Sequence, residues 1–137
     1  MRLVRIKHEI WDVQAILDES DNSSAWSELE AADPSDSGAE RMRATLETEV
    51  PLNGPPRMNK TKCRDLGGGI YEFKESGVRV LWFYDAGKTI VCSHVSPKVP
   101  KKKFQQEIKT AKRLRDAYTV SKLAGKLKVL NRSEIKR

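Results

Sequence analysis

The stretch from Ile70 to His94 most constrains the fold, because two glycine-containing turns divide it into three β-strand patterns. Ile70–Glu75 and Val78–Asp85 are rich in β-branched and aromatic residues, as strands are. Ser76-Gly77 between them is typical of a two-residue hairpin turn, and Ala86-Gly87 predicts a second one. The sequence therefore predicts an antiparallel meander of three strands.

The lengths of these turns fix which residues face one another. A two-residue turn at Ser76-Gly77 places Lys74 opposite Arg79, and a two-residue turn at Ala86-Gly87 places Arg79 opposite His94. Like charges directly opposite on a sheet repel, so this row predicts a position where an anion binds between the cations. A slip of one residue would send these side chains to the other face.

Alternation of side chains along the strands predicts two different faces. One face is almost entirely apolar and needs helices to cover it: Tyr71, Phe73, Val80, Trp82, Tyr84, Val91 and Val95. The other face is apolar at one end and cationic at the other: Ile70, Leu81, Phe83, Ile90 and Cys92, then Lys74, Arg79 and His94, with Glu72 nearby.

The remaining segments predict helices and one more strand around this meander. Arg2–Lys7 alternates as a short strand does, and the spacing of apolar residues predicts a short helix over Glu9–Leu17. Further helical segments are expected at Ala25–Ala31, Ala39–Glu49 and Lys103–Tyr118, and Arg57–Leu66 is expected to be partly extended. The basic tail after Tyr118 contains a marginal helical pattern over residues 122–137.

The fold class expected is α+β, in one domain of 137 residues. Within that domain we expect an acidic strand-and-helix region over residues 1–60, a sheet-and-helix core over 61–118 and a basic tail over 119–137. No apolar run approaches the roughly 20 residues that cross a bilayer. No secretory leader is evident, so we expect a cytoplasmic protein.

Charge is distributed unevenly along the chain. Residues 1–50 carry 5 Lys/Arg and 12 Asp/Glu, a net −7, whereas residues 51–137 carry 21 and 7, a net +14. A basic half of this size is typical of proteins that bind nucleic acids, although it also serves plain solubility. The two cysteines, Cys63 and Cys92, lack metal-ligand spacing, so we expect reduced thiols, no metal and no other cofactor.

The residues of the cationic row suit metal-independent cleavage of RNA. In that reaction the ribose 2′-hydroxyl attacks the phosphorus, and the enzyme moves two protons and stabilises added negative charge. Arg79 can clamp phosphate oxygens, and His94 is a candidate acid or base. Lys74 can bind phosphate or transfer a proton, and Glu72 is the alternative base. Candidate RNA-binding residues are Lys62, Arg64, Lys98, Lys101, Lys102 and Lys103.

Several motifs of this region occur together in one known family. Leu66-Gly67-Gly68, Tyr71-Glu72-Phe73-Lys74, Arg79-Val80, His94 and Glu107-Ile108-x-x-Ala111 follow one another in the order found there. With the lysines Lys98 and Lys101 between the last two, the pattern resembles the core of RelE/ParE-superfamily toxins, nearest the HigB-like and phage-derived branch. The match covers under half of the chain.

The resemblance implies a RelE-like fold, in which an N-terminal strand and helices pack on a twisted antiparallel sheet that is followed by a last helix. It implies the toxin of a type II toxin–antitoxin system, neutralised by an antitoxin from a separate gene. Many relatives cleave mRNA on the ribosome, so mRNA and rRNA are expected partners. Arg79 falls where the nucleases keep a phosphate-binding arginine, and Lys74 where they keep a basic strand residue.

Two other function classes are compatible with the same sequence. Some superfamily members inhibit DNA gyrase without cutting RNA, and a phage-derived protein can bind a host factor. A third possibility is an RNA-binding module without cleavage, which predicts binding that weakens steeply with salt. The chain departs from the family at its last site residues, where Pro97-Lys98-Val99-Pro100-Lys101 replaces the family's continuous basic turn.

Overall fold

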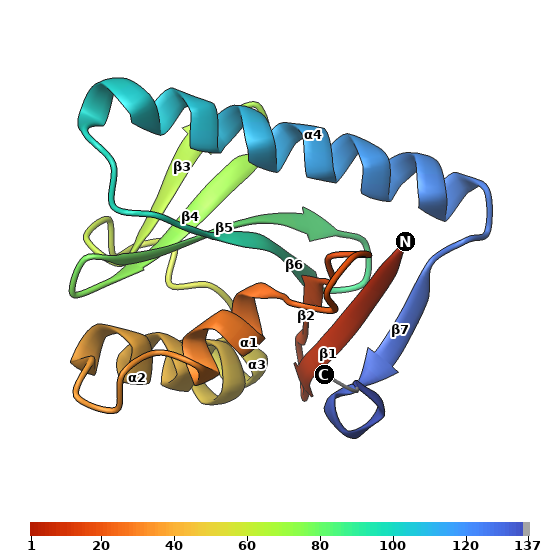
Figure 1. Cartoon of the computed structure of the whole chain (residues 1–137), viewed down its shortest axis with the longest axis horizontal. Helices are drawn as coiled ribbons and strands as arrows, with labels where there is room; N and C mark the ends of the chain where they lie inside the picture. Colours follow the sequence, from red (N-terminus) through yellow and green to blue (C-terminus); the bar gives the residue numbers. More distant parts are fainter. Residues whose placement is uncertain (136–137) are drawn as a thin grey trace.

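A computed structural model describes residues 1–135 and shows a sheet between two helical layers. The seven strands lie in the order β3-β4-β5-β6-β2-β1-β7. Helices α1 to α3 cover one face and the long helix α4 covers the other (Figure 1). The predicted α+β class with a RelE-like arrangement is confirmed. In residues 1–135 no helix is both long and apolar enough to cross a membrane.

The central meander forms where the sequence predicts it. It consists of β3 (Cys63–Gly67), β4 (Ile70–Glu75), β5 (Val78–Asp85) and β6 (Thr89–Ser96). Ser76 and Gly77 both have positive φ, at 47° and 86°, as a two-residue turn of the hairpin type requires. Lys74 therefore pairs with Arg79, as predicted.

The predicted register between β5 and β6 is wrong. Arg79 pairs with Ser96, and His94 pairs with Leu81. The observed partner of Arg79 is two residues further along β6 than the predicted one. The turn accounts for one of these residues, because the loop contains Lys88 as well as Ala86 and Gly87, and Lys88 adopts a positive φ of 57°. A bulge beside Leu81 adds the second residue, so that β6 carries one more residue than β5 at this point.

The two shifts have different effects on the faces of β6. The longer loop reverses the predicted faces of Ile90, Val91 and Cys92: Ile90 and Cys92 pack toward α1–α3, and Val91 packs toward α4. The bulge then restores the original alternation, because each added residue exchanges the two faces. His94 consequently lies on the α4 side, as predicted, although it does not face Arg79.

The predicted helix over Glu9–Leu17 is wrong. Residues Asp12–Ile16 form strand β2, which pairs antiparallel with β1 (Arg2–His8) and parallel with β6. Every residue of β2 is buried, including the polar side chains of Asp12 and Gln14. Polar and apolar residues alternate only over Asp12–Ala15, a stretch too short to outweigh the helical spacing of the apolar residues around it. The helical spacing was fortuitous, since Ile10, its first apolar residue, is 60% exposed.

The acidic segment forms the helical layer below the sheet in Figure 1. Helix α1 spans Ala25–Glu30, where the sequence predicts it, and begins with a reciprocal cap between Ser24 and Ser27. The predicted helix Ala39–Glu49 is longer: α2 (Ser37–Ala44) continues through a π-helical turn (Thr45–Glu49) into α3 (Val50–Asn53). Pro51 lacks the N–H that a regular helical ladder would use there.

The basic tail also differs from its prediction. After the 3₁₀ turn Lys101–Lys103, helix α4 extends over Phe104–Leu123, five residues past Tyr118. The chain then forms strand β7 (Lys128–Asn131), parallel to β1, and a 3₁₀ turn (Arg132–Glu134) instead of a marginal helix. Residues 136–137 of the predicted tail lie outside the described residues.

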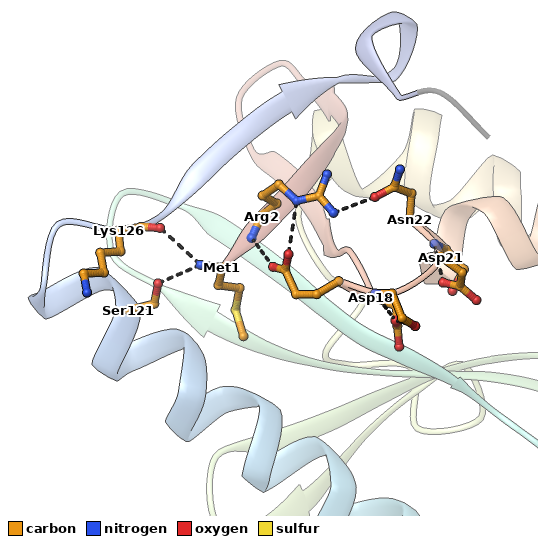
Figure 2. Close-up of polar contacts among 10 residues, drawn as sticks. Met1, Arg2, Asp18, Asp21, Asn22, Ser121 and Lys126 are labelled. Carbon is orange, nitrogen blue, oxygen red and sulfur yellow. Dashed lines mark hydrogen bonds and ion pairs between the residues drawn. The ribbon is translucent and has the colours of Figure 1, made fainter.

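Polar contacts at the chain's start help to hold β7 in place (Figure 2). The amino group of Met1 donates to the hydroxyl of Ser121 at 3.1 Å and to the carbonyl of Lys126 at 3.2 Å. The Lys128 N–H donates to the Met1 carbonyl at 3.0 Å. These contacts join β1, the end of α4 and β7, so the tail completes the sheet.

Candidate functional site

A cationic hollow of about 400 Å³ lies between the β4–β5 hairpin, the exit from β6 and the start of α4. Three elements form it: the tip of the β4–β5 hairpin, the exit from β6 and the first residue of α4. Its cationic side chains are Lys74, Arg79 and Lys98. The other lining residues are Gly77, Ser96, Pro97, Val99 and Phe104. We call this site the Arg79 hollow.

The local structure explains why these cations meet. The two-residue turn sets Lys74 directly opposite Arg79, and the register of β6 brings Ser96 beside Arg79 from the other side. Chain exit through Pro97 then places Lys98 over the same hollow. Within the described part of the chain, no ion pair joins Lys74 or Lys98 to a carboxylate. The hollow therefore has positive charge that an anion could neutralise.

The guanidinium of Arg79 is held in place by two contacts. Its central carbon lies 5.0 Å from the centre of the Phe104 ring, within the range of a cation–π contact. Its Nη1 lies 4.0 Å from Oε2 of Glu72. The side chain of Arg79 is still 31% exposed, so its guanidinium can reach a ligand in the hollow.

Glu72 is completely buried between two arginines. Its side chain has 0% exposure, and its Oε1 accepts a hydrogen bond of 2.6 Å from Nε of Arg64. Its Oε2 accepts no hydrogen bond within residues 1–135 and faces Arg79 across 4.0 Å. A carboxylate without exposed surface is better suited to holding Arg64 and Arg79 than to removing a proton from a bound ribose.

His94 belongs to a different environment from the Arg79 hollow. Its Nε2 lies 3.0 Å from Oε1 of Glu107 on α4, and its Nδ1 lies 2.9 Å from the Ser93 hydroxyl. It lines a second hollow of about 360 Å³, together with Arg113 and residues near the start of the chain. Burial lowers the pKa of His94, against the opposing effect of the Glu107 carboxylate.

The predicted RNA-binding residues separate into three groups. Lys98 lines the Arg79 hollow, and the exposed side chains of Lys101, Lys102 and Lys103 form the turn that leads into α4. Arg64 lies beside Glu72 at the outer strand β3. Lys62 instead lies 3.4 Å from Glu75, whose carboxylate also accepts a hydrogen bond from Thr45 of the π-helical turn. Lys62 is thus directed away from the hollow.

Three residues of these environments were not expected from the sequence as site residues. Phe104 and Ser96 carried no functional signal, and Glu107 was noted only within the family motif Glu107-Ile108-x-x-Ala111. In the structure Ser96 pairs with Arg79, and His94 on the α4 side contacts Glu107. Within residues 1–135, His, Cys, Asp and Glu side chains form no group of three that could hold a metal ion.

The fold and the hollow together define an α+β protein with a RelE-like arrangement and a cationic hollow at one end of its sheet. Comparison with family models is more specific: residues 28–116 match the family described as Phage derived protein Gp49-like (DUF891). The chain belongs to this family, which is related to the RelE/HigB-like toxins. A search of curated proteins found no match.

Proposed function

We propose that this protein is the toxin of a type II toxin–antitoxin system and that it cleaves mRNA on the ribosome without a metal ion. The observation that carries the proposal is the Arg79 hollow, where Lys74, Arg79 and Lys98 surround a space open to an anion. Membership of a phage-derived, toxin-related family favours the same class. Within the superfamily we assign the chain to the HigB-like branch.

The proposed chemistry follows from the charges in the hollow. Arg79 binds the non-bridging oxygens of the scissile phosphate and stabilises the charge that develops when the 2′-hydroxyl attacks. Lys98 binds the same or the adjacent phosphate. Lys74 acts as the acid that protonates the 5′-oxygen as the P–O5′ bond breaks, and solvent water takes the proton of the attacking 2′-hydroxyl. Glu72 acts through Arg79, which it holds in position.

His94 has a less direct part in this proposal. Its ring contacts Glu107 and Ser93, so it couples β6 to the first turns of α4, where Phe104 packs against Arg79. We therefore propose His94 as a positioning residue in this structure. An acid–base role would require the imidazole to leave Glu107 when the ribosome is bound.

The proposed partners are an antitoxin encoded by a separate gene, mRNA and ribosomal RNA, all in the cytoplasm. An antitoxin would neutralise the activity by covering the Arg79 hollow or by preventing access to the ribosome. The exposed lysines of the turn Lys101–Lys103 are proposed to contact the ribosomal RNA backbone, because they lie beside the hollow and pair with no carboxylate in the described chain.

The test is induced expression in a bacterial host, followed by sequencing of transcript ends and of total RNA. The native chain is expected to halt translation and leave mRNA cut within codons. Arg79→Ala removes the phosphate clamp and is expected to restore growth and reduce cutting by 10²-fold or more, on the order of the loss for one charge-stabilising group. Lys128→Ala, an exposed lysine on β7 at the opposite edge of the sheet, is the matched control.

Two outcomes would overturn the proposal. Arrest by the Arg79→Ala protein with intact transcripts would show that toxicity does not come from cleavage at this hollow. Arrest by the native chain with intact RNA and altered plasmid supercoiling would indicate a gyrase inhibitor instead.

A further inference from the structure

A second cationic feature lies on the opposite face of the sheet from the Arg79 hollow. Tyr71, Phe73 and Trp82 belong to the face covered by α1–α3, whereas Arg79 packs against α4. On this face four planar groups are stacked from the core to the surface: Phe73, Trp82, Tyr71 and Arg57. We call this arrangement the Arg57 column.

The inner part of the column is rigid. The rings of Phe73 and Trp82 are 4.6 Å apart and inclined by 20°, and those of Trp82 and Tyr71 are 4.8 Å apart and inclined by 23°. Phe73 and Trp82 are fully buried, so the surrounding core fixes their orientation. Tyr71 is only partly buried and presents its other side toward Arg57.

The exposed end of the column is the Arg57 guanidinium. Its central carbon lies 4.5 Å from the centre of the Tyr71 ring, and its Nη1 donates a hydrogen bond of 3.1 Å to the Tyr84 hydroxyl. The cation–π contact and the hydrogen bond hold the planar group in place. Arg57 is exposed, and the central carbon of its guanidinium also lies 6.0 Å from the centre of the Tyr84 ring.

The loop that carries Arg57 is ordered by its own hydrogen bonds. Pro55 and Pro56 restrict the backbone before it, and the Asn59 side chain accepts hydrogen bonds from the hydroxyl and N–H of Thr61. At its start, Gly54 has a φ of 78° and a Cβ there would lie 2.8 Å from Nε1 of Trp11. The loop thus packs closely on Trp11, and Arg57 is presented from a fixed backbone.

The Arg57 column has the chemistry of a stacking platform for a nucleobase. A flat cation over aromatic rings offers a surface that any base can stack on, and a neighbouring cation can bind the adjoining phosphate. Lys60 supplies such a cation on the same loop, and neither Arg57 nor Lys60 has a carboxylate partner in the described chain. An acidic peptide would use the charge but would leave the stacking surface unused.

We propose that the Arg57 column binds one base of single-stranded RNA outside the Arg79 hollow. This proposal rests on the proposed function only for the choice of RNA as the ligand. It concerns binding at the column and does not require that the RNA be cleaved. Strand β3 forms the edge of the sheet beside β4, and Arg64 on this strand is 47% exposed.

The test uses the full-length chain and a single-stranded 2′-O-methyl RNA, which lacks the attacking hydroxyl and cannot be cut by the proposed reaction. The RNA carries 2-aminopurine, whose fluorescence is quenched when the base stacks. We expect the native protein to bind and to quench it. Arg57→Ala is expected to weaken binding by about tenfold and remove the quenching, in line with the loss of one stacked base.

Three variants make the result specific. Arg57→Lys keeps the positive charge but lacks the planar guanidinium. This variant is therefore expected to retain the salt dependence of RNA binding and to lose the quenching. Lys60→Ala removes a charge from the same loop and should retain the quenching. Arg79→Ala should weaken binding but leave the quenching intact, which separates failure at the hollow from failure at the column. Melting temperatures establish that each variant is folded.

The proposal would be overturned if Arg57→Ala bound the RNA with the affinity and quenching of the native protein. It would also be overturned if an acidic peptide competed for the column in an Arg57-dependent way while the RNA was not quenched. The second result would assign the surface to a protein partner. Quenching that persists in Arg57→Lys would show that charge alone, without a planar group, is sufficient, and would reject the stacking platform.

Discussion

At the scale of single residues, Glu72 is the least expected group, because a carboxylate with no exposed surface lies between two arginines. We predict that Glu72→Gln lowers the free energy of unfolding by about 1–3 kcal/mol, the usual range for a hydrogen bond to a charged group. The loss is limited because the guanidiniums of Arg64 and Arg79, 47% and 31% exposed, can be hydrated by water. Urea denaturation measures the change.

A matched control variant separates the effect of burying Glu72 from the effect of neutralising a paired carboxylate. Glu47→Gln breaks an ion pair of 2.6 Å with Arg132 in which both side chains are 39% exposed. Exposed pairs contribute about 0–1 kcal/mol, so this variant should remain close to the native protein. An equal loss of unfolding free energy in the two variants would mean that the burial of Glu72 adds nothing to the stability of the protein.

Two of the candidate residues show what sequence can and cannot predict at this scale. The pairing of Lys74 with Arg79 followed from Ser76-Gly77, since a two-residue turn leaves one register. The partner of His94 depended on one loop residue with positive φ, Lys88, and on a bulge whose extra residue carries no sequence signature of its own. Local turn chemistry was therefore sufficient for the first hairpin and insufficient for the second.

At the scale of secondary-structure elements, the errors arise where tertiary contacts override local pattern. Strand β2 is short, and its brief alternation lies within the longer helical spacing of Ile10, Val13 and Ile16, which led to the wrong prediction. Strand β7 lies in a lysine-rich tail and becomes a strand by pairing with β1. Helix α4 was predictable because an apolar stripe identified it, whereas the cap between Ser24 and Ser27 that begins α1 is a finding of the structure.

Helix α4 is attached to the sheet by a titratable contact, which makes its docking sensitive to pH. Asp85 at the end of β5 accepts hydrogen bonds from Nζ of Lys122 at 2.7 Å and from the Tyr118 hydroxyl at 2.5 Å. Burial raises the pKa of Asp85, but these hydrogen bonds outweigh that effect and bring the pKa below its ordinary value of 3.8.

The sign of the pH dependence follows from this lowered pKa. Between the folded and unfolded pKa values of Asp85 the unfolded chain binds more protons, so stability rises with pH in that window. The contribution is complete above about pH 5 and is lost as the pH falls through about 4 toward the folded value. We predict that Asp85→Asn lowers the melting temperature at pH 6 and that the difference from the native protein shrinks toward pH 3. A difference that stays constant over this range would contradict the prediction.

At the scale of the whole molecule, the two helical layers differ in the sign of charge that predominates. The helical layer of α1, α2 and the π-helical turn carries Glu28, Glu30, Glu40, Glu47 and Glu49. The layer of α4 and the turn before it carries Lys101, Lys102, Lys103, Lys109, Lys112, Arg113, Arg115 and Lys122. The asymmetry seen along the sequence thus becomes an asymmetry between the two helical layers of Figure 1, and the α4 layer carries the excess of positive charge.

This arrangement predicts a salt dependence that can be assigned to particular lysines. Each phosphate neutralised on a single strand contributes about 0.7 to the slope of log K against log salt concentration. Lys98→Ala removes one cation from the Arg79 hollow, so the slope for single-stranded RNA should become shallower by about 0.7. Lys128→Ala removes the same charge at the far edge of the sheet, so it should leave the slope unchanged. If both variants changed the slope equally, the RNA would be responding to the net charge of +7 and not to the hollow, because only local contact distinguishes one exposed lysine from another.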